Sequence, residues 1–185
     1  MVAEIETYQD QLLSIAQDVP GLIGKLSTEQ FNWRPADNRW SMAECFDHLN
    51  VTARLFIPAI DVAIADARAR KLESGGPFTY PVLERLFLRM TEPPPKLRFR
   101  APKAFAPSPN KAVAPVLTEF MDWQQQFGDR LRRADGIDLS RARHRSPAVS
   151  WVTWRLGTIF AVMLAHERRH VWQARTVRND PRFPS

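Results

Sequence analysis

The sequence has almost no cysteine and no long apolar run, and each shortage excludes a class of protein. A single cysteine, Cys45, among 185 residues cannot form an internal disulfide and is typical of a reducing compartment. No apolar stretch reaches about 18 residues, so we expect neither a membrane span nor a membrane partner. The first residues lack a basic segment followed by an apolar one, and we therefore expect a cytoplasmic protein.

Acidic residues are in the minority, because 26 Lys and Arg against 20 Asp and Glu give a formal net charge of +6. A cluster of basic side chains is one requirement for binding nucleic acid. The arginines are spread along the chain, however, with a local concentration only at 130–145, and there is no zinc-finger or basic-zipper pattern. We therefore expect a solvated basic surface, and association with nucleic acid through 130–145 is the less favoured alternative.

Strand patterns are lacking as well, whereas apolar residues recur at the spacing of three and four that is typical of amphipathic helices. Ser41, with Glu44 three residues later, forms a capping box that marks the start of one helix. Long helices in a chain of this length predict an all-α fold, a four-helix bundle, within a single domain that spans 1–185. The expected elements are long helices at 3–24, 41–71, 112–134 and 154–178 and a short turn at 27–32.

Proline is concentrated in one region, 73–110, which separates the second and third long helices. A connection of this length crosses an end of the bundle, where it either covers a pocket as a lid or lies on the surface as a loop. The basic segment 137–153 is expected to be a loop that exposes His144. Within the proline-rich crossover only 81–91 has a helical pattern, carried by Val82, Leu83, Leu86, Phe87 and Met90.

Three polar side chains interrupt the apolar face of the 154–178 helix. His166 and His170 are one turn apart, so their Cβ atoms lie roughly 5–6 Å from each other and both rings can bind one metal ion. Glu167 falls near the middle of the apolar stripe, where an unpaired carboxylate would be very costly. The pattern H-E-x-x-H also occurs in zinc proteases, but no third ligand follows it. A third ligand must come from upstream; otherwise the two histidines are hydrogen-bonded core residues.

His48 is the upstream residue that completes a ligand set, because sites in helical bundles are built from side chains on facing helices. Three neutral imidazoles with an open fourth position are typical of catalytic zinc sites. We therefore predict His48, His166 and His170 as ligands of a divalent metal that activates water or a thiol. Zinc or nickel is the first choice, and iron(II) or manganese is an alternative.

Glu167 is the candidate catalytic residue. It acts either as a general base or as a partner that orients a ligand histidine. Three tryptophans precede the two helices that carry the histidines, and these rings either line the mouth of a pocket or pack in the core. They are Trp40, Trp151 and Trp154.

Two segments of the chain resemble a known family. The segment NWRPADNRWSMAECFDHL (32–49), followed far downstream by AHERRHVWQ (165–173), is similar to the DinB-like, or YfiT-like, superfamily. The similarity lies in a Trp-Ser helix start, a histidine seven residues after the serine, and a late H-E-x-x-H-x-x-Q helix. It implies a four-helix bundle with a long crossover and a metal centre of three histidines, which map onto His48, His166 and His170. The proline-rich 73–110 segment has no counterpart in this resemblance.

The resemblance implies metal-dependent chemistry on small molecules. Some members resemble thiol S-transferases that use bacillithiol or mycothiol, and others are regarded as hydrolases or isomerases. We therefore expect a metal-dependent enzyme that activates a thiol or water toward a small electrophilic substrate, with a low-molecular-weight thiol as an optional cofactor. The alternative is a non-enzymatic bundle that binds a ligand or partner at an unmetallated site. A homodimer formed through a helix face is compatible with either function.

Overall fold

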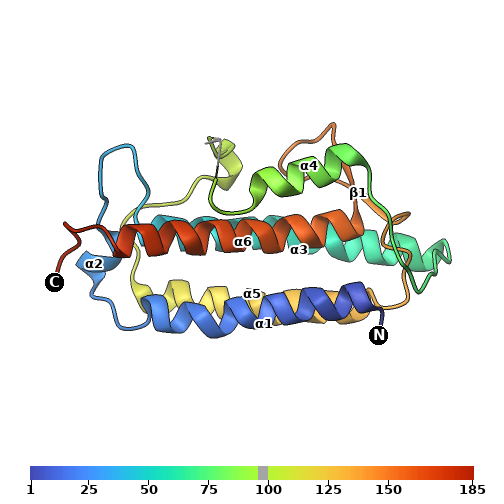
Figure 1. Cartoon of the computed structure of the whole chain (residues 1–185), viewed down its shortest axis with the longest axis horizontal. Coiled ribbons are helices and arrows are strands. Elements are labelled where there is room, and N and C mark those ends of the chain that lie inside the picture. The colour runs from blue at the N-terminus through green and yellow to red at the C-terminus, as the bar shows by residue number, and fades with distance from the viewer. Residues whose placement is uncertain (96–99) are drawn as a thin grey trace.

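The computed structural model describes residues 1–95 and 100–185, and within them the chain is mostly helical, as the all-α expectation requires. Four long helices run along the long axis of the molecule (Figure 1). Shorter elements lie in the connections between them: α2 (Thr28–Asn32), α4 (Val82–Thr91) and a 3-10 turn, η1 (Lys103–Phe105). The long helices are α1 (Ala3–Ile23), α3 (Met42–Ala69), α5 (Val113–Arg133) and α6 (Leu156–Arg178).

The core lies where these four helices turn their apolar stripes toward one another. α3 packs against α5 and α6, and α1 packs against the same two helices. Aromatic rings pack between the helices: Phe46 contacts Phe120 with ring centroids 5.5 Å apart, and Phe127 contacts Phe160 with centroids 5.8 Å apart. All four are fully buried. Because burying one such side chain contributes roughly 1.5–3 kcal/mol, this apolar contact is what holds the helices at fixed positions along one another.

The start of α3 is fixed by the capping box that the sequence predicts. The backbone N–H of Glu44 donates to Ser41 Oγ at 3.2 Å, and the backbone N–H of Ser41 donates to Glu44 Oε2 at 2.9 Å. Arg34 adds an ion pair with the same carboxylate. Each side chain thus satisfies a backbone donor that the first helical turn leaves unpaired. The cap sets where α3 begins, and therefore where His48 stands along it.

The structure corrects the expectation that the chain lacks strands and that 137–153 is only a loop. β1 (Arg143–Arg145) pairs antiparallel with β2 (Thr153–Arg155), and His144 stands opposite Trp154. Strands of three residues are too short for alternating apolar and polar residues to be recognised in a sequence. As a consequence α6 begins at Leu156 rather than at 154, and His144 is half-buried rather than exposed.

The proline-rich connection is tied to the long helices at several points. α4 lies along α6 on the side away from α1 (Figure 1). The 3-10 turn η1 contacts α3. The buried Glu84 of α4 accepts hydrogen bonds from Arg155 Nη1, at 2.6 Å, and from Thr158 Oγ1. Tyr80 donates to Glu4 of α1. Residues 96–99 of the segment expected to be a lid or a loop lie outside the described residues.

Among the described residues, α3 is the one helix whose length and hydropathy would suffice to cross a membrane. Of the stretch that meets this test, 56% is buried against the rest of the protein. Burial of this kind is typical of the central helix of a folded core. The apolar character of α3 is therefore explained by its contacts with α5 and α6.

Candidate metal centre

The three predicted histidines meet at one point between α3 and α6. Nε2 of His166 lies 3.1 Å from Nε2 of His48 and 3.1 Å from Nε2 of His170. One possible ligand atom from each ring lies within 4.8 Å of the other two. His166 and His170 face the same direction because they are one helical turn apart on α6. His48 reaches them from the facing helix, since α3 and α6 pack against each other.

The tautomer of His48 is determined by its surroundings. Its Nδ1 lies 2.6 Å from the backbone carbonyl oxygen of Phe105, which can only accept a hydrogen bond, so Nδ1 carries the proton. Nε2 is then left with a lone pair directed at His166 Nε2, 3.1 Å away. A histidine whose second nitrogen donates to a backbone carbonyl is the usual arrangement of a metal ligand. This orientation therefore fits the prediction that His48 is a ligand.

The two distances from His166 Nε2 to the other ligand nitrogens suit a single divalent metal. With metal–nitrogen distances of about 2.0–2.1 Å, adjacent ligand nitrogens are about 3.3 Å apart in a tetrahedral site and about 2.9 Å apart in an octahedral one. Both distances from His166 Nε2, 3.1 Å, lie between these values, and the ligand atoms of all three rings lie within 4.8 Å of one another. One N–H on His166 can satisfy at most one neighbouring lone pair with good geometry, whereas a shared cation satisfies all three. The donor set thus fits a metal and does not select one geometry.

All three rings are held in the neutral form that metal ligation requires. Burial lowers the pKa of His48, and the Phe105 carbonyl and the Asp47 charge offset this only in part. Burial, with further contributions from His48 and Arg169, lowers the pKa of His166 to about 3. The pKa of His170 is also well below its ordinary value, chiefly because of burial. Neutral imidazoles present lone pairs rather than protons to a cation.

Trp40 forms one wall of the centre. Its ring is stacked on that of His170, with centroids 5.6 Å apart and an angle of 26° between the planes. It also contacts His48 at a centroid distance of 4.9 Å. Within the described part of the chain, Nδ1 of His170 is buried without a hydrogen-bond partner, although the Gln173 side chain acts to raise the pKa of His170. Stacking on Trp40 therefore orients this ring, whereas a hydrogen bond orients His48.

Asp47 on α3 holds the segment that follows Phe105 in place. Asp47 is buried beside His48; its Oδ2 accepts a hydrogen bond from the backbone N–H of Ser108 at 2.7 Å, and its Oδ1 pairs with Lys111 Nζ at 3.2 Å. These contacts fasten the segment after η1 to the start of α3. Sequence reasoning did not identify Phe105, because every residue has a backbone carbonyl and no side-chain pattern marks this one.

Glu167 is buried next to the centre, but its carboxylate points at α5. Gln124 Nε2 donates to Glu167 Oε1 at 3.1 Å, while Glu167 Oε2 and Gln124 Oε1 have no hydrogen-bond partner among the residues that the structure describes. Burial raises the pKa of this carboxyl to about 7, and Gln124 and Arg168 offset part of the rise. The two roles predicted for Glu167 stay predictions. Gln124 was missed, although a polar residue on the apolar face between Phe120 and Phe127 was a usable signal.

The other residues singled out in the sequence are Cys45, Trp151, Trp154 and Glu44. Cys45 is fully buried, and burial raises the pKa of its thiol, so it is protonated and unreactive at neutral pH. Trp154 packs on Phe87 of α4 with centroids 5.0 Å apart, whereas Trp151 is 86% exposed. Among the described residues, neither of these tryptophan rings contacts the three histidines. Glu44 completes the capping box of α3 with the N-cap residue Ser41.

The basic region 130–145 is partly neutralised within the fold. Arg130 and Arg133 both pair with Asp61, and Arg132 pairs with Asp129. Paired guanidinium groups are less available to phosphates. The contacts of these arginines therefore give no support to the nucleic-acid alternative.

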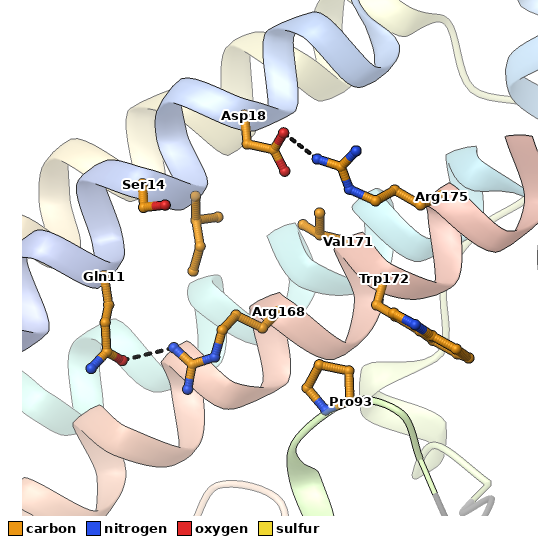
Figure 2. A pocket seen from close by; sticks show the side chains of 9 residues that line it. Gln11, Ser14, Asp18, Pro93, Arg168, Val171, Trp172 and Arg175 are labelled. Carbon is orange, nitrogen blue, oxygen red and sulfur yellow. Dashed lines mark hydrogen bonds and ion pairs between the residues drawn. The ribbon is translucent and has the colours of Figure 1, made fainter.

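A groove of about 500 Å³ lies between α1 and α6 and is separate from the histidines. Figure 2 shows two polar pairs in it, Arg168 with Gln11 and Arg175 with Asp18. Val171 and Trp172 provide its apolar part. At about 100° per residue, these α6 positions fall on the face opposite His166 and His170. The groove therefore does not lead to the candidate centre.

Comparison with known proteins agrees with the resemblance seen in the sequence. A family model described as the DinB superfamily matches residues 11–174, which include all three histidines. No curated protein and no solved structure matches the chain.

Proposed function

This chain belongs to the DinB superfamily, and we propose that it is a metal-dependent enzyme whose metal is held by His48, His166 and His170. The convergence of three Nε2 atoms in a largely buried setting is the observation that carries this proposal. The superfamily is associated with metal-dependent enzymes. The proposed architecture is a single domain with the form of a four-helix bundle, in which 73–110 is a proline-rich crossover between α3 and α5.

The ligands of the proposed centre are the three Nε2 atoms. When bound, a divalent metal with three imidazole ligands and a free position supplies Lewis acidity, which lowers the pKa of a thiol or of water. Zinc and nickel are the preferred metals, with iron(II) and manganese as alternatives, because imidazole binds all four. The proposed reaction is transfer of a low-molecular-weight thiol to, or hydrolysis of, a small electrophilic substrate.

The residues around the ligands have distinct parts in this proposal. The Phe105 carbonyl holds the proton on His48 Nδ1 and thereby keeps Nε2 as a lone pair. Trp40 covers one face of His170 and excludes water from that side. Glu167 has a pKa of about 7, so it can hold or release a proton at neutral pH. Its carboxylate is directed at Gln124 of α5 and not at the three Nε2 atoms, which favours a supporting role beside the ligand His166 over that of a general base. Its bond to Gln124 fixes the direction of the carboxylate.

The proposed setting is the cytoplasm, and the proposed partner is a small molecule. The free, buried Cys45 is compatible with a reducing compartment. Nucleic acid is not proposed as a partner, because several arginines of 130–145 are already paired with aspartates.

The test is metal analysis of tag-free protein, since a histidine tag would itself bind metal. Wild type is compared with His166→Ala, and His144→Ala is the matched control because His144 lies on β1, outside the centre. We expect close to one metal ion per chain in wild type and in the control, and loss of that metal in His166→Ala. Circular dichroism checks that all three proteins are folded. Equal trace metal in all three would reject the proposal and leave the non-enzymatic alternative.

A further inference from the structure

α4 is an amphipathic helix whose apolar side faces away from the protein. Its inner side carries the buried polar residues Glu84 and Thr91. Apolar surface in contact with water is unfavourable, and a contiguous stripe of this kind usually marks an interaction surface. The outer side carries Val82, Leu83, Leu86 and Phe87, which are 68%, 78%, 51% and 39% exposed.

The polar contacts of α4 fix this orientation. Glu84 accepts hydrogen bonds from Arg155 and Thr158, and Arg169 donates to the backbone carbonyl of Met90 at 3.2 Å. If α4 rotated to bury its apolar stripe, Arg155 would lose its carboxylate partner. The exposed stripe is therefore a stable property of the folded chain and not a result of weak attachment.

The exposed apolar surface extends from α4 toward the β hairpin. The hairpin packs against the same helix, through Trp154 on Phe87 and Arg155 on Glu84. Trp151, in the loop between the two strands, is 86% exposed. With roughly 150–250 Å² for a large aromatic side chain and somewhat less for Leu or Val, these exposed groups amount to about 600 Å² per chain. Two such surfaces reach about 1,200 Å², the lower limit of specific interfaces.

We propose that a second copy of this chain covers this surface, with the two α4 helices packed across a two-fold axis. A two-fold axis presents one surface to an identical one, so apolar residues meet apolar residues in both directions. At about 100° per residue Arg85 and Arg89 fall on one edge of the stripe, where they stay in solvent and their repulsion is screened by salt. Large exposed aromatic side chains contribute most to such contacts, so Trp151 is an anchor of the interface.

The proposal names the interface of the homodimer that the sequence leaves open, and it is independent of the metal centre. Its test is sedimentation velocity on the full, tag-free chain from about 1 to 100 µM, a range in which moderately stable dimers dissociate. Leu83→Asp places a charge in the stripe. Leu13→Asp is the matched control, because Leu13 on α1 is also exposed, at 57%, but lies outside the stripe. Circular dichroism confirms that each variant is folded.

We expect wild type and Leu13→Asp to dimerise alike, and Leu83→Asp to raise the dissociation constant by about 30-fold or more, as for a central interface residue. Trp151→Ala is a second variant that leaves α4 unchanged, and we expect it to weaken the dimer by about tenfold. A wild-type chain that remains monomeric overturns the proposal. So does a dimer that survives both substitutions, since its interface then lies elsewhere. Flotation with vesicles of zwitterionic and anionic lipid completes the test, because a monomer that binds them through Leu83 uses the stripe for lipid.

Discussion

Replacing Glu167 by Gln should change how the stability of the metal-free protein depends on pH. The Glu167 residue is 6% exposed; one carboxyl oxygen accepts a hydrogen bond from Gln124, and the other has no partner in residues 1–95 and 100–185. Burial raises the pKa of Glu167 from its ordinary 4.5 to about 7. Gln has nearly the same shape as the protonated acid but cannot ionise. The substitution therefore removes the titration while retaining the packing.

The sign of the effect follows from proton binding. Between pH 4.5 and 7 the folded chain holds a proton on Glu167 that the unfolded chain has released. The free energy of unfolding falls as pH rises wherever the folded state binds more protons. The contribution of the protonated Glu167 carboxyl to the free energy of unfolding is fully present below pH 4.5 and is lost as pH rises through 7. At roughly 1.4 kcal/mol for each pH unit between the two pKa values, the loss amounts to about 3 kcal/mol.

Titration of the histidines changes the free energy of unfolding with pH in the opposite direction. This contribution must be removed from the comparison. The pKa of His166 is lowered to about 3, so between pH 3 and 6.5 the unfolded chain holds the extra proton and stability rises with pH. This contribution is common to wild type and Glu167→Gln and disappears from their difference. Urea unfolding in the presence of EDTA, followed by tryptophan fluorescence from pH 4.5 to 8, measures that difference. We expect similar stabilities at the acid end and a variant more stable by about 3 kcal/mol at pH 8. A difference that stays constant over the whole range refutes the reasoning.

Two further substitutions test contacts around the centre and along α6. Trp40→Ala should weaken metal binding by about tenfold, because the ring that orients His170 is lost, and Trp40→Phe should restore most of the affinity; competition with a chromophoric chelator measures both. Equal affinities for Trp40→Ala and wild type would show that stacking does not position the ligand. Gly157→Ala should destabilise the fold by about 1–3 kcal/mol, since its Cβ would lie 1.9 Å from Tyr80 Oη. Adding Tyr80→Ala should cost less than the sum of the single losses in thermal melts, and strict additivity would contradict this contact.

The long helices could be predicted from sequence because each has its own apolar stripe and, for α3, its own capping box. Ser41 and Glu44 act on neighbouring backbone groups, so their pattern can be read locally. The pair His166 and His170 is local in the same sense, because one helical turn joins them. The β hairpin and the direction in which α4 faces were not predictable in this way. The apolar pattern at 81–91 marks a helix correctly but does not say which side meets the protein, which depends on Glu84 finding Arg155.

The candidate centre depends on one contact between residues far apart in the sequence, which is the placement of His48 opposite His166 and His170. The spacing of His166 and His170 along the chain is set by α6 alone, so the ligand set is completed when His48 stands opposite them. The capping box fixes the position of His48 along α3, and the Phe105 carbonyl, held through Asp47, fixes the direction of its ring. Loosening the segment after η1 should therefore weaken the contribution of His48 while the α6 pair keeps its spacing. It follows that the proline-rich connection, which matches no local motif, controls the ring direction of the one ligand that comes from a different helix.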